Sequence, residues 1–400
     1  MSDTTEGGRT MSDTAAPRWY ERAAATSYAP YQTAVLRVGL AAVWLVYLLR
    51  HWPDRAAIYG PDAAWSRAMA ERGVPPEKGF SALLWWDGQA YFEVFYLLAV
   101  AAAVALLLGW RTRASSVVFV LCMLSFQHRN DYVTTAGDRL LHILALYLLF
   151  ARCAQVWSLD ARRAARRAAG DRDTTGILLW ALLGALFAPL ALAGLFSAGW
   201  IALLGGLWAA QGLWWWAARA RGEDGAAREV CDRIAHLVHN GALFVIGAQI
   251  CLVYASAGWY KIQGTTWQNG SAVYYAMHLE FLTPWPALSH ALSGNALLSL
   301  VMTYGTVAIQ VAFPFALMRR KVKNVLLVLM IGEHIGIWVL MGLPYFSMVM
   351  IAADAVFAPT VLLLWLDRRC GALWDRVRPG RRPEGKPAIP DQTGAPAPVP

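Results

Sequence analysis

Long apolar runs separated by short polar segments dominate the pattern of this chain. A helix that spans a membrane needs about 20 apolar residues. By that measure the pattern predicts ten spanning helices, at 31–49, 90–109, 114–127, 138–155, 176–197, 199–218, 236–260, 295–318, 323–342 and 345–367. We therefore expect an all-α, polytopic integral membrane bundle with no large soluble domain.

Basic residues alternate between the two sides of this predicted bundle. If the N-terminus lies inside, the inner segments hold most of the 35 basic residues, and the outer loops hold few. Positively charged loops stay on the cytoplasmic side of a membrane. The distribution predicts that both termini lie in the cytoplasm, and we expect the membrane to be a bacterial inner (plasma) membrane. It also puts the loop 128–137 and the turn after Lys261 on the outer side.

The predicted membrane domain covers residues 31–367. A polar tail, 1–30, precedes it, and we expect no signal peptide because the first apolar run is too long for one. The segment 368–400 is rich in Pro, Gly and charge and is expected to be a disordered cytoplasmic tail. Residues 176–218 carry no ionisable side chain, so they are predicted to form an inserted hairpin that faces lipid.

Composition points to the same class of protein. Hydrophobic residues make up 58% and charged residues 15%, whereas soluble domains are nearer half and a quarter. The net charge of +9 lies in short clusters between apolar runs, so no nucleic-acid partner is expected. The five cysteines lack CxxC spacing, and the histidines lack HxxxH or HExxH spacing. Neither a disulfide framework nor a metal site is predicted.

Several ionisable side chains fall inside the predicted spans, where each is costly unless it is paired or hydrated. Asp138 and His142 are four residues apart, on one helical face. Glu333, His334 and Asp354 come from two later spans, at a depth of about 12–14 Å for a rise of roughly 1.5 Å per residue. Such groups form either a buried polar pocket that opens outward or an interhelical network that only fixes packing.

Other polar residues within the spans are assigned structural roles. Arg37, near the inner end of the first span, is expected to anchor its helix by snorkelling toward the surface. Gln310 is expected to join neighbouring helices by hydrogen bonds. His236 and His239 lie near the inner end of their span, away from the polar pocket.

Lys261 is the most informative residue of the chain. Only five of the 35 basic residues are lysines. An arginine would anchor the end of a helix as well as a lysine does. A lysine at this position therefore indicates a need for an amine that can lose its proton, which a guanidinium cannot do.

The residues around Lys261 follow a regular spacing. The motif reads Tyr254-x-x-Ala257-Gly258-x-x-Lys261-x-x-Gly264-x-x-Trp267-x-x-Gly270-x-Ala272, supported by Gly109-Trp110-Arg111, Arg129-Asn130, Gly137-Asp138, Ser158-Leu159-Asp160 and His334 followed by Ser347. This pattern resembles the signature of the HTTM (horizontally transferred transmembrane) family. That family contains the membrane domain of vitamin K-dependent gamma-glutamyl carboxylase. The resemblance extends from about Tyr31 to Leu366.

The resemblance implies an enzyme with an outward-facing pocket. It implies that Lys261 is an amine base toward a reduced quinone of the vitamin K type. Asp138, His142 and His334 are expected to orient groups or stabilise charge. The candidate substrate-binding residues are Arg129, Asn130, Tyr254, Trp267, Tyr275, His278 and Glu333.

The resemblance leaves the substrate open. In the carboxylase a large lumenal domain binds the peptide glutamate that is carboxylated, whereas only residues 368–400 follow the last predicted span here. Full glutamate carboxylation is therefore not expected, and quinone oxidation, epoxidation or another base-catalysed step stays open. Smaller bacterial relatives are linked to maturation of a secreted peptide toxin, which keeps a secreted peptide as an alternative substrate. The competing class is a non-catalytic membrane partner or export factor, in which Lys261 only snorkels.

Overall fold

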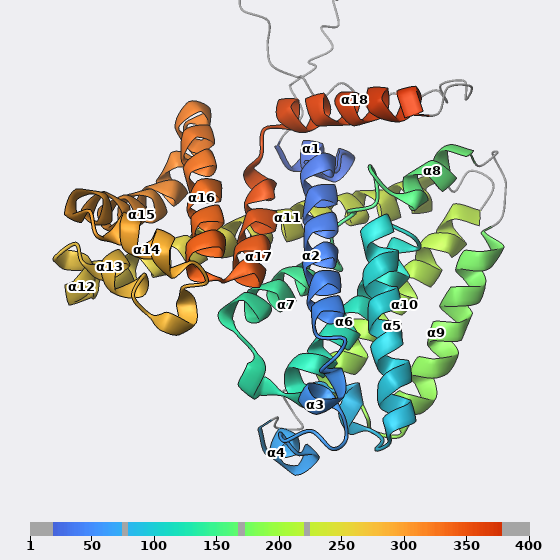
Figure 1. The fold of residues 1–400 in the computed structure, drawn as a ribbon. Coiled ribbons are helices and arrows are strands. Elements are labelled where there is room, and N and C mark those ends of the chain that lie inside the picture. Colours follow the sequence, from blue (N-terminus) through green and yellow to red (C-terminus); the bar gives the residue numbers. More distant parts are fainter. Residues whose placement is uncertain (1–18, 74–78, 167–172, 220–224, 378–400) are drawn as a thin grey trace, which may run out of the picture.

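The computed structural model describes residues 19–73, 79–166, 173–219 and 225–377 (Figure 1). Throughout these ranges the regular structure is helical, and no strand occurs. The helices, with 3-10 helices marked η, are α1 (Trp19–Ala25), α2 (Pro30–Arg50), α3 (Arg55–Tyr59), α4 (Arg67–Gly73), η1 (Ala82–Leu84), α5 (Gln89–Leu108), α6 (Thr112–Arg129), η2 (Asp131–Val133), α7 (Ala136–Leu148), α8 (Leu159–Arg166), α9 (Thr174–Leu192), α10 (Ala198–Arg219), α11 (Gly225–Gln263), α12 (Thr265–Gln268), α13 (Ala272–Ala276), η3 (Glu280–Leu282), α14 (Pro286–Ser293), α15 (Ala296–Ala316), α16 (Arg320–Met341), α17 (Pro344–Asp354), η4 (Ala355–Phe357) and α18 (Thr360–Val377). The prediction of an all-α chain is confirmed for these residues. The predicted tails lie largely outside them.

Six of the described helices are long and apolar enough to cross a membrane, which indicates a membrane-embedded protein. They are α2, α5, α9, α11, α15 and α16. A seventh crossing results if α17 and η4 count with α18 as one bent span. The expected number of ten spans is therefore not confirmed.

The predicted spans 114–127, 138–155 and 199–218 correspond to α6, α7 and α10, which do not meet that measure. The clearest difference is in α7, which has only 13 residues. Its first turn is held by a capping box between Thr135 and Asp138, and its last residue is Leu148. A helix of that length is too short to cross about 30 Å of hydrocarbon upright.

The last predicted span, 345–367, is not one straight helix. Between η4 and α18 the chain bends by 108°. Ala358 is extended, with ψ 139°, because the ring of Pro359 disfavours a helical conformation of the residue before it. As a result, α18 lies across one end of the bundle in Figure 1.

The ends of the bundle differ in their helices. Figure 1 shows α1, α8 and α18 at one end and α3 and α4 at the other. The charge pattern assigns α1, α8 and the end of α18 from residue 368 on to the inner side, and α3 and α4 to the long outer loop. The two sets of segments thus lie at opposite ends of the bundle, as expected. Which end faces the cytoplasm stays a prediction.

The predicted hairpin 176–218 consists of α9 and α10. Trp180 and Trp208 stack with ring centroids 4.2 Å apart. Each indole N–H donates to the backbone carbonyl of the other tryptophan, at 2.9 and 3.0 Å. Most side chains of α9 lie on the surface, as expected for a helix that faces lipid.

The candidate site is built on the other side of the molecule. There, α11 packs against α15, α15 against α16, and α16 against α17. Figure 1 shows α17 beside α2, and α2 packs in turn against α5. Polar side chains on α11, α15, α16 and α17 can therefore meet between helices.

Arg37 is buried and not a snorkelling anchor, which corrects the expectation from its position. Its exposed fraction is 0%. Its guanidinium donates to the carbonyl oxygens of Leu106 (2.6 Å), Leu107 (2.8 Å), Trp157 (2.7 Å) and Cys153 (3.1 Å). The last carbonyls of α5 form the negative end of the helix dipole, which stabilises a cation there. Arg37 therefore joins α2 to the end of α5 and to the segment after α7.

Candidate functional site

The Tyr254 hydroxyl is the centre of a buried group of three polar side chains, which we name the buried triad (Tyr254, His334 and Asp354). The three residues come from α11, α16 and the last residue of α17, and each is at most 2% exposed. Tyr254 Oη lies 3.0 Å from His334 Nε2, 2.9 Å from Asp354 Oδ1 and 3.0 Å from Oδ2. The His334 and Asp354 side chains of two different helices are thereby joined through one phenol.

Small residues and aromatic rings hold these helices close together. A Cβ on Gly258, one turn after Tyr254, would lie 2.6 Å from the Val311 side chain, so only glycine allows this approach of α11 to α15. The Tyr254 ring packs edge-on against Phe313, with centroids 5.5 Å apart. On the α17 side, Phe346 packs against the His334 ring at 5.7 Å. The position of the triad thus follows from the packing of α11, α15, α16 and α17.

A second polar group, which we name the lysine chain, consists of Lys261, Gln310 and Glu333. Lys261 Nζ donates to Gln310 Oε1 at 2.8 Å, and Gln310 Nε2 donates to Glu333 Oε1 at 2.5 Å. Lys261 Nζ also lies 5.2 Å from the centroid of the Trp267 ring. Because Glu333 directly precedes His334 on α16, the lysine chain and the buried triad are neighbours.

The Lys261 amine is held by a neutral amide. Across the described residues, no carboxylate forms an ion pair with Lys261. The carboxylate of Glu333 accepts from the Gln310 amide nitrogen, which turns the amide oxygen toward the lysine. Lys261 is half-buried, whereas Gln310 is buried.

Two polar atoms of neighbouring residues have no hydrogen-bond partner among the described residues. Glu333 Oε2 and His334 Nδ1 are both buried and form no hydrogen bond. The same is true of Ser347 Oγ on α17. A buried polar atom without a partner costs about 1–3 kcal/mol. The region where the lysine chain meets the buried triad therefore offers hydrogen-bonding capacity to a bound molecule.

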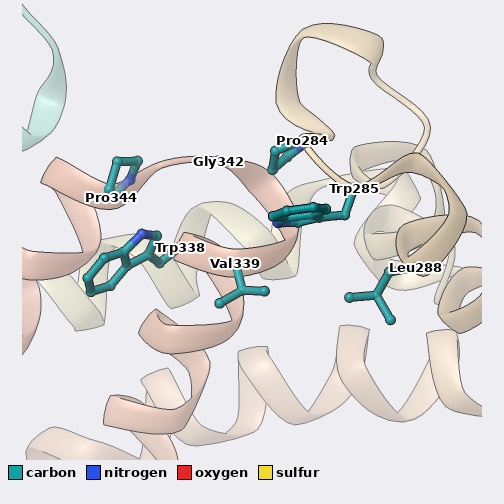
Figure 2. A pocket seen from close by; sticks show the side chains of 7 residues that line it. All are labelled: Pro284, Trp285, Leu288, Trp338, Val339, Gly342 and Pro344. Carbon is teal, nitrogen blue, oxygen red and sulfur yellow. The ribbon is translucent and has the colours of Figure 1, made fainter.

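An apolar groove of about 560 Å³ lies at the end of α16 that leads into α17 (Figure 2). It is lined by Pro284, Trp285, Leu288, Trp338, Val339, Gly342 and Pro344. Figure 2 shows the Trp338 and Trp285 rings on either side of Val339. Gly342 ends α16 with φ 62°, a conformation that favours glycine, and Pro284 packs against it. Trp338 is one helical turn beyond His334, so the groove and the triad share α16.

The structure thus brings together Lys261, Trp267, Glu333, Tyr254 and His334 of the predicted site residues. Other partners are found for Asp138, Arg129, Asn130, Tyr275 and His278, and none of these contacts reaches the lysine chain.

Asp138 has a local role in starting α7. Its Oδ2 accepts from the Thr135 backbone N–H at 2.8 Å and from the Thr135 hydroxyl at 2.7 Å, and its own N–H faces Thr135 Oγ1 at 3.4 Å. This is a capping box, which satisfies the free N–H groups at a helix start.

His142 is half-buried one turn later. No hydrogen bond within the described part of the chain connects it to either polar group.

Removal of this cap should weaken α7. We expect Thr135→Ala and Asp138→Ala each to lower the free energy of unfolding by about 1 kcal/mol. The double variant should lose less than the sum, because both changes break the same box. Thermal unfolding of the wild type, the two single variants and the double variant in detergent micelles measures these differences. Full additivity, or an unchanged stability of Asp138→Ala, would show that the carboxylate has no capping role.

Arg129 and Asn130 fasten the long loop that follows α2. Arg129 donates to the carbonyl oxygens of Trp65 at 2.8 Å and Gly60 at 2.5 Å. Asn130 Nδ2 donates to the Ile58 carbonyl oxygen at 2.9 Å. Both residues are buried, and their contacts fix a fold of the loop.

Tyr275 and His278 lie on the surface of the segment between α12 and α15. The His278 ring stacks on that of His290, with centroids 4.6 Å and planes 10° apart. Its Nδ1 lies 2.7 Å from the Tyr274 carbonyl oxygen. Tyr275 is 57% exposed. No group of three or more His, Cys, Asp or Glu side chains that could hold a metal ion occurs in the described ranges.

Two residues of the site, Asp354 and Gln310, were not among the predicted catalytic or substrate-binding residues. Asp354 had a signal, because its depth matched that of Glu333 and His334. Gln310 was expected to join neighbouring helices and does so, but its link to Lys261 could not be predicted because it depends on the rotation of α15 against α11. Comparison with known proteins adds no further residue: no family model, no curated protein and no solved structure matches this chain.

Proposed function

We propose that this chain is an integral membrane enzyme of the HTTM family that uses Lys261 as a base on a lipid-soluble, quinone-like substrate. The observation that carries the proposal is the Gln310 amide, which holds the Lys261 amine at 2.8 Å where a carboxylate would form an ion pair. An amide oxygen orients an amine or an ammonium group alike. A carboxylate would favour the ammonium form and hold the proton on the lysine.

The polar surroundings of Lys261 support the role of a general base. A base must lie within hydrogen-bonding distance of the proton that it removes and must have a lone pair available. Gln310 fixes the position of Nζ, and Glu333 fixes the orientation of Gln310. Trp267 gives an apolar, flat surface next to the amine. These contacts fix the position of the amine without an ion pair.

The residues present also fit a hydroquinone. A flat ring with two oxygens needs an aromatic surface and polar partners, which Trp267 and the unpaired Glu333 Oε2 and His334 Nδ1 offer. A hydroquinone supplies the electrons for molecular oxygen, with the balance hydroquinone plus oxygen giving quinone epoxide plus water. Lys261 would take the proton of a hydroxyl group, and Glu333 and His334 would bind oxygens of the ring. Carboxylation of a peptide is not part of this proposal.

Turnover of a defined hydroquinone tests the substrate class. The full-length protein in lipid nanodiscs should consume oxygen when it is given a reduced 1,4-naphthoquinone with a short isoprenoid tail. Mass spectrometry should find the epoxide, above the level of nanodiscs without protein. A Lys321→Ala variant is the matched control, because Lys321 is an exposed lysine at the start of α16. No oxygen uptake with naphtho- and benzo-hydroquinones of several tail lengths would reject a quinone-like substrate.

A further inference from the structure

The Tyr254 hydroxyl has more hydrogen-bonding neighbours than it has protons. Its oxygen lies within 3.0 Å of one imidazole nitrogen and of both oxygens of one carboxyl group. A phenol donates one hydrogen bond and accepts others. Two directions of hydrogen bonding are therefore compatible with the same positions of the heavy atoms.

In the first direction, Asp354 is a carboxylate. The phenol of Tyr254 donates to Asp354, and Nε2–H of His334 donates to the phenol. The imidazole is neutral, and its lone pair is on Nδ1, the buried nitrogen without a partner. The triad then carries one negative charge.

In the second direction, Asp354 is a carboxylic acid. Its O–H donates to the phenol of Tyr254, and the phenol donates to Nε2 of His334. The imidazole is again neutral, but its proton is on Nδ1. The triad then carries no charge and one more proton.

We propose that the buried triad is a proton relay, which accepts a proton at His334 Nδ1 and stores it on Asp354. When a proton binds Nδ1, the Nε2–H proton moves to the Tyr254 oxygen and the phenol proton moves to an Asp354 oxygen. Each of the three groups gains one bond to hydrogen, and His334 and Tyr254 each lose one. The net change is one proton added to Asp354, with His334 changed only in its tautomer.

Burial explains why the proton would continue to Asp354. If it stayed on the imidazole, His334 and Asp354 would form a buried ion pair separated by a phenol. Two separated charges in an apolar interior carry a desolvation cost that a neutral acid and a neutral imidazole avoid. Asp354 is 0% exposed, so the neutral state is the one that its surroundings favour.

The proposal goes beyond the proposed function, because it requires neither Lys261 as a base nor a quinone. It assigns Tyr254 and Asp354 as positioning residues that act through His334. Within the described ranges, the other ionisable side chains that interact with the triad are Glu333 and Lys261. Both belong to the lysine chain. A test of the relay must therefore measure the protonation of His334 and Asp354 directly.

Two spectroscopic signals of the full-length protein in nanodiscs can follow the relay during an acid titration. Infrared spectra detect the C=O stretch of a protonated carboxylic acid, which Asp354→Asn identifies as that of Asp354. Nitrogen-15 NMR of labelled histidine distinguishes an imidazolium from the two neutral tautomers, and His334→Gln identifies the signal of His334 among the eight histidines. We expect the Asp354 acid band and the Nδ1–H tautomer of His334 to arise together, without an imidazolium.

Tyr254→Phe should separate the two signals. The phenylalanine keeps the ring that packs against Phe313, but it cannot pass a proton, so His334 should become an imidazolium in acid. Tyr96→Phe is the matched control, because Tyr96 is also buried and donates one hydrogen bond, to the Leu48 carbonyl oxygen at 2.6 Å. If Tyr254→Phe does not fold, Asp354→Asn gives the same readout, since it removes the end of the relay.

Either of two results would overturn the relay. One is an imidazolium at His334 in the wild-type protein while Asp354 is still a carboxylate. The other is a titration of His334 that is the same in wild type, Tyr254→Phe and Asp354→Asn. Neither result depends on turnover, so failure of the relay can be distinguished from failure of the quinone proposal.

Discussion

Replacing Lys261 by arginine should lower hydroquinone turnover at least about 100-fold, the lower end of what a general base contributes. Arginine keeps the positive charge and can still donate to Gln310. A guanidinium does not lose its proton in a protein, so the base is lost while the contact is kept. The initial rate of oxygen uptake by nanodisc-embedded protein measures the effect. The free energy of unfolding should change little, which thermal unfolding of the same samples checks.

The same variant separates the enzyme from the competing class of function. A non-catalytic partner or an export factor needs Lys261 only as a cationic anchor, and arginine serves that role as well. Lys321→Arg, at an exposed lysine of α16, controls for the substitution itself. If Lys261→Arg turned over substrate at the wild-type rate, or fully replaced the wild-type gene in a deletion strain, Lys261 would not be a base.

Replacing Arg37 by methionine should lower the free energy of unfolding by about 3 kcal/mol or more. Methionine has a similar length but no donor, so it leaves four carbonyl oxygens without the guanidinium. Each buried acceptor that loses a charged donor costs about 1–3 kcal/mol, and water at the end of α5 recovers part of this. Unfolding in mixed micelles, followed by circular dichroism, gives the difference.

Arg72→Met is the matched control for Arg37→Met. Arg72 lies on α4, is exposed and donates one hydrogen bond, to the Ala68 carbonyl oxygen. Its replacement should change the stability by less than about 0.5 kcal/mol. A loss as small as this for Arg37→Met would mean that the guanidinium does not hold α2 to the end of α5.

The long apolar helices and the proximity of His334 and Asp354 could be predicted from local patterns. Apolar runs of sufficient length indicated α2, α5, α9, α11, α15 and α16, because hydrocarbon thickness sets the length of a span. A rise of about 1.5 Å per residue put His334 and Asp354 at one depth. The structure joins these two side chains through Tyr254, a residue of the motif around Lys261.

Contacts between distant segments could not be predicted. Arg37 was expected at the surface because its helix end is near the inner side, but its partners come from α5 and from the segment after α7. In the same way, the link from Lys261 to Gln310 depends on how α15 is rotated against α11. Neither a period nor a motif within one helix contains that information.

For Asp138, the local pattern had a simpler explanation than catalysis. Thr135 followed three residues later by an acidic residue is typical of a capping box at a helix start. The spacing of Asp138 and His142 also suited a polar face, and the resemblance to the carboxylase favoured that interpretation. The hydrogen bonds found for the Asp138 side chain are those of the cap.

The central claim is that Lys261 supplies a lone pair to the substrate, and chemical rescue tests it most directly. Lys261→Ala removes the amine and opens space beside Gln310. Small primary amines of similar size but different basicity, such as ethylamine and 2-fluoroethylamine, should restore hydroquinone turnover in this variant, and the rate per free amine should rise with the basicity of the amine. Ethylguanidinium has similar size and charge but no available lone pair, so it should restore none. Equal restoration by the guanidinium, or wild-type turnover of Lys261→Ala without any added amine, would contradict the claim.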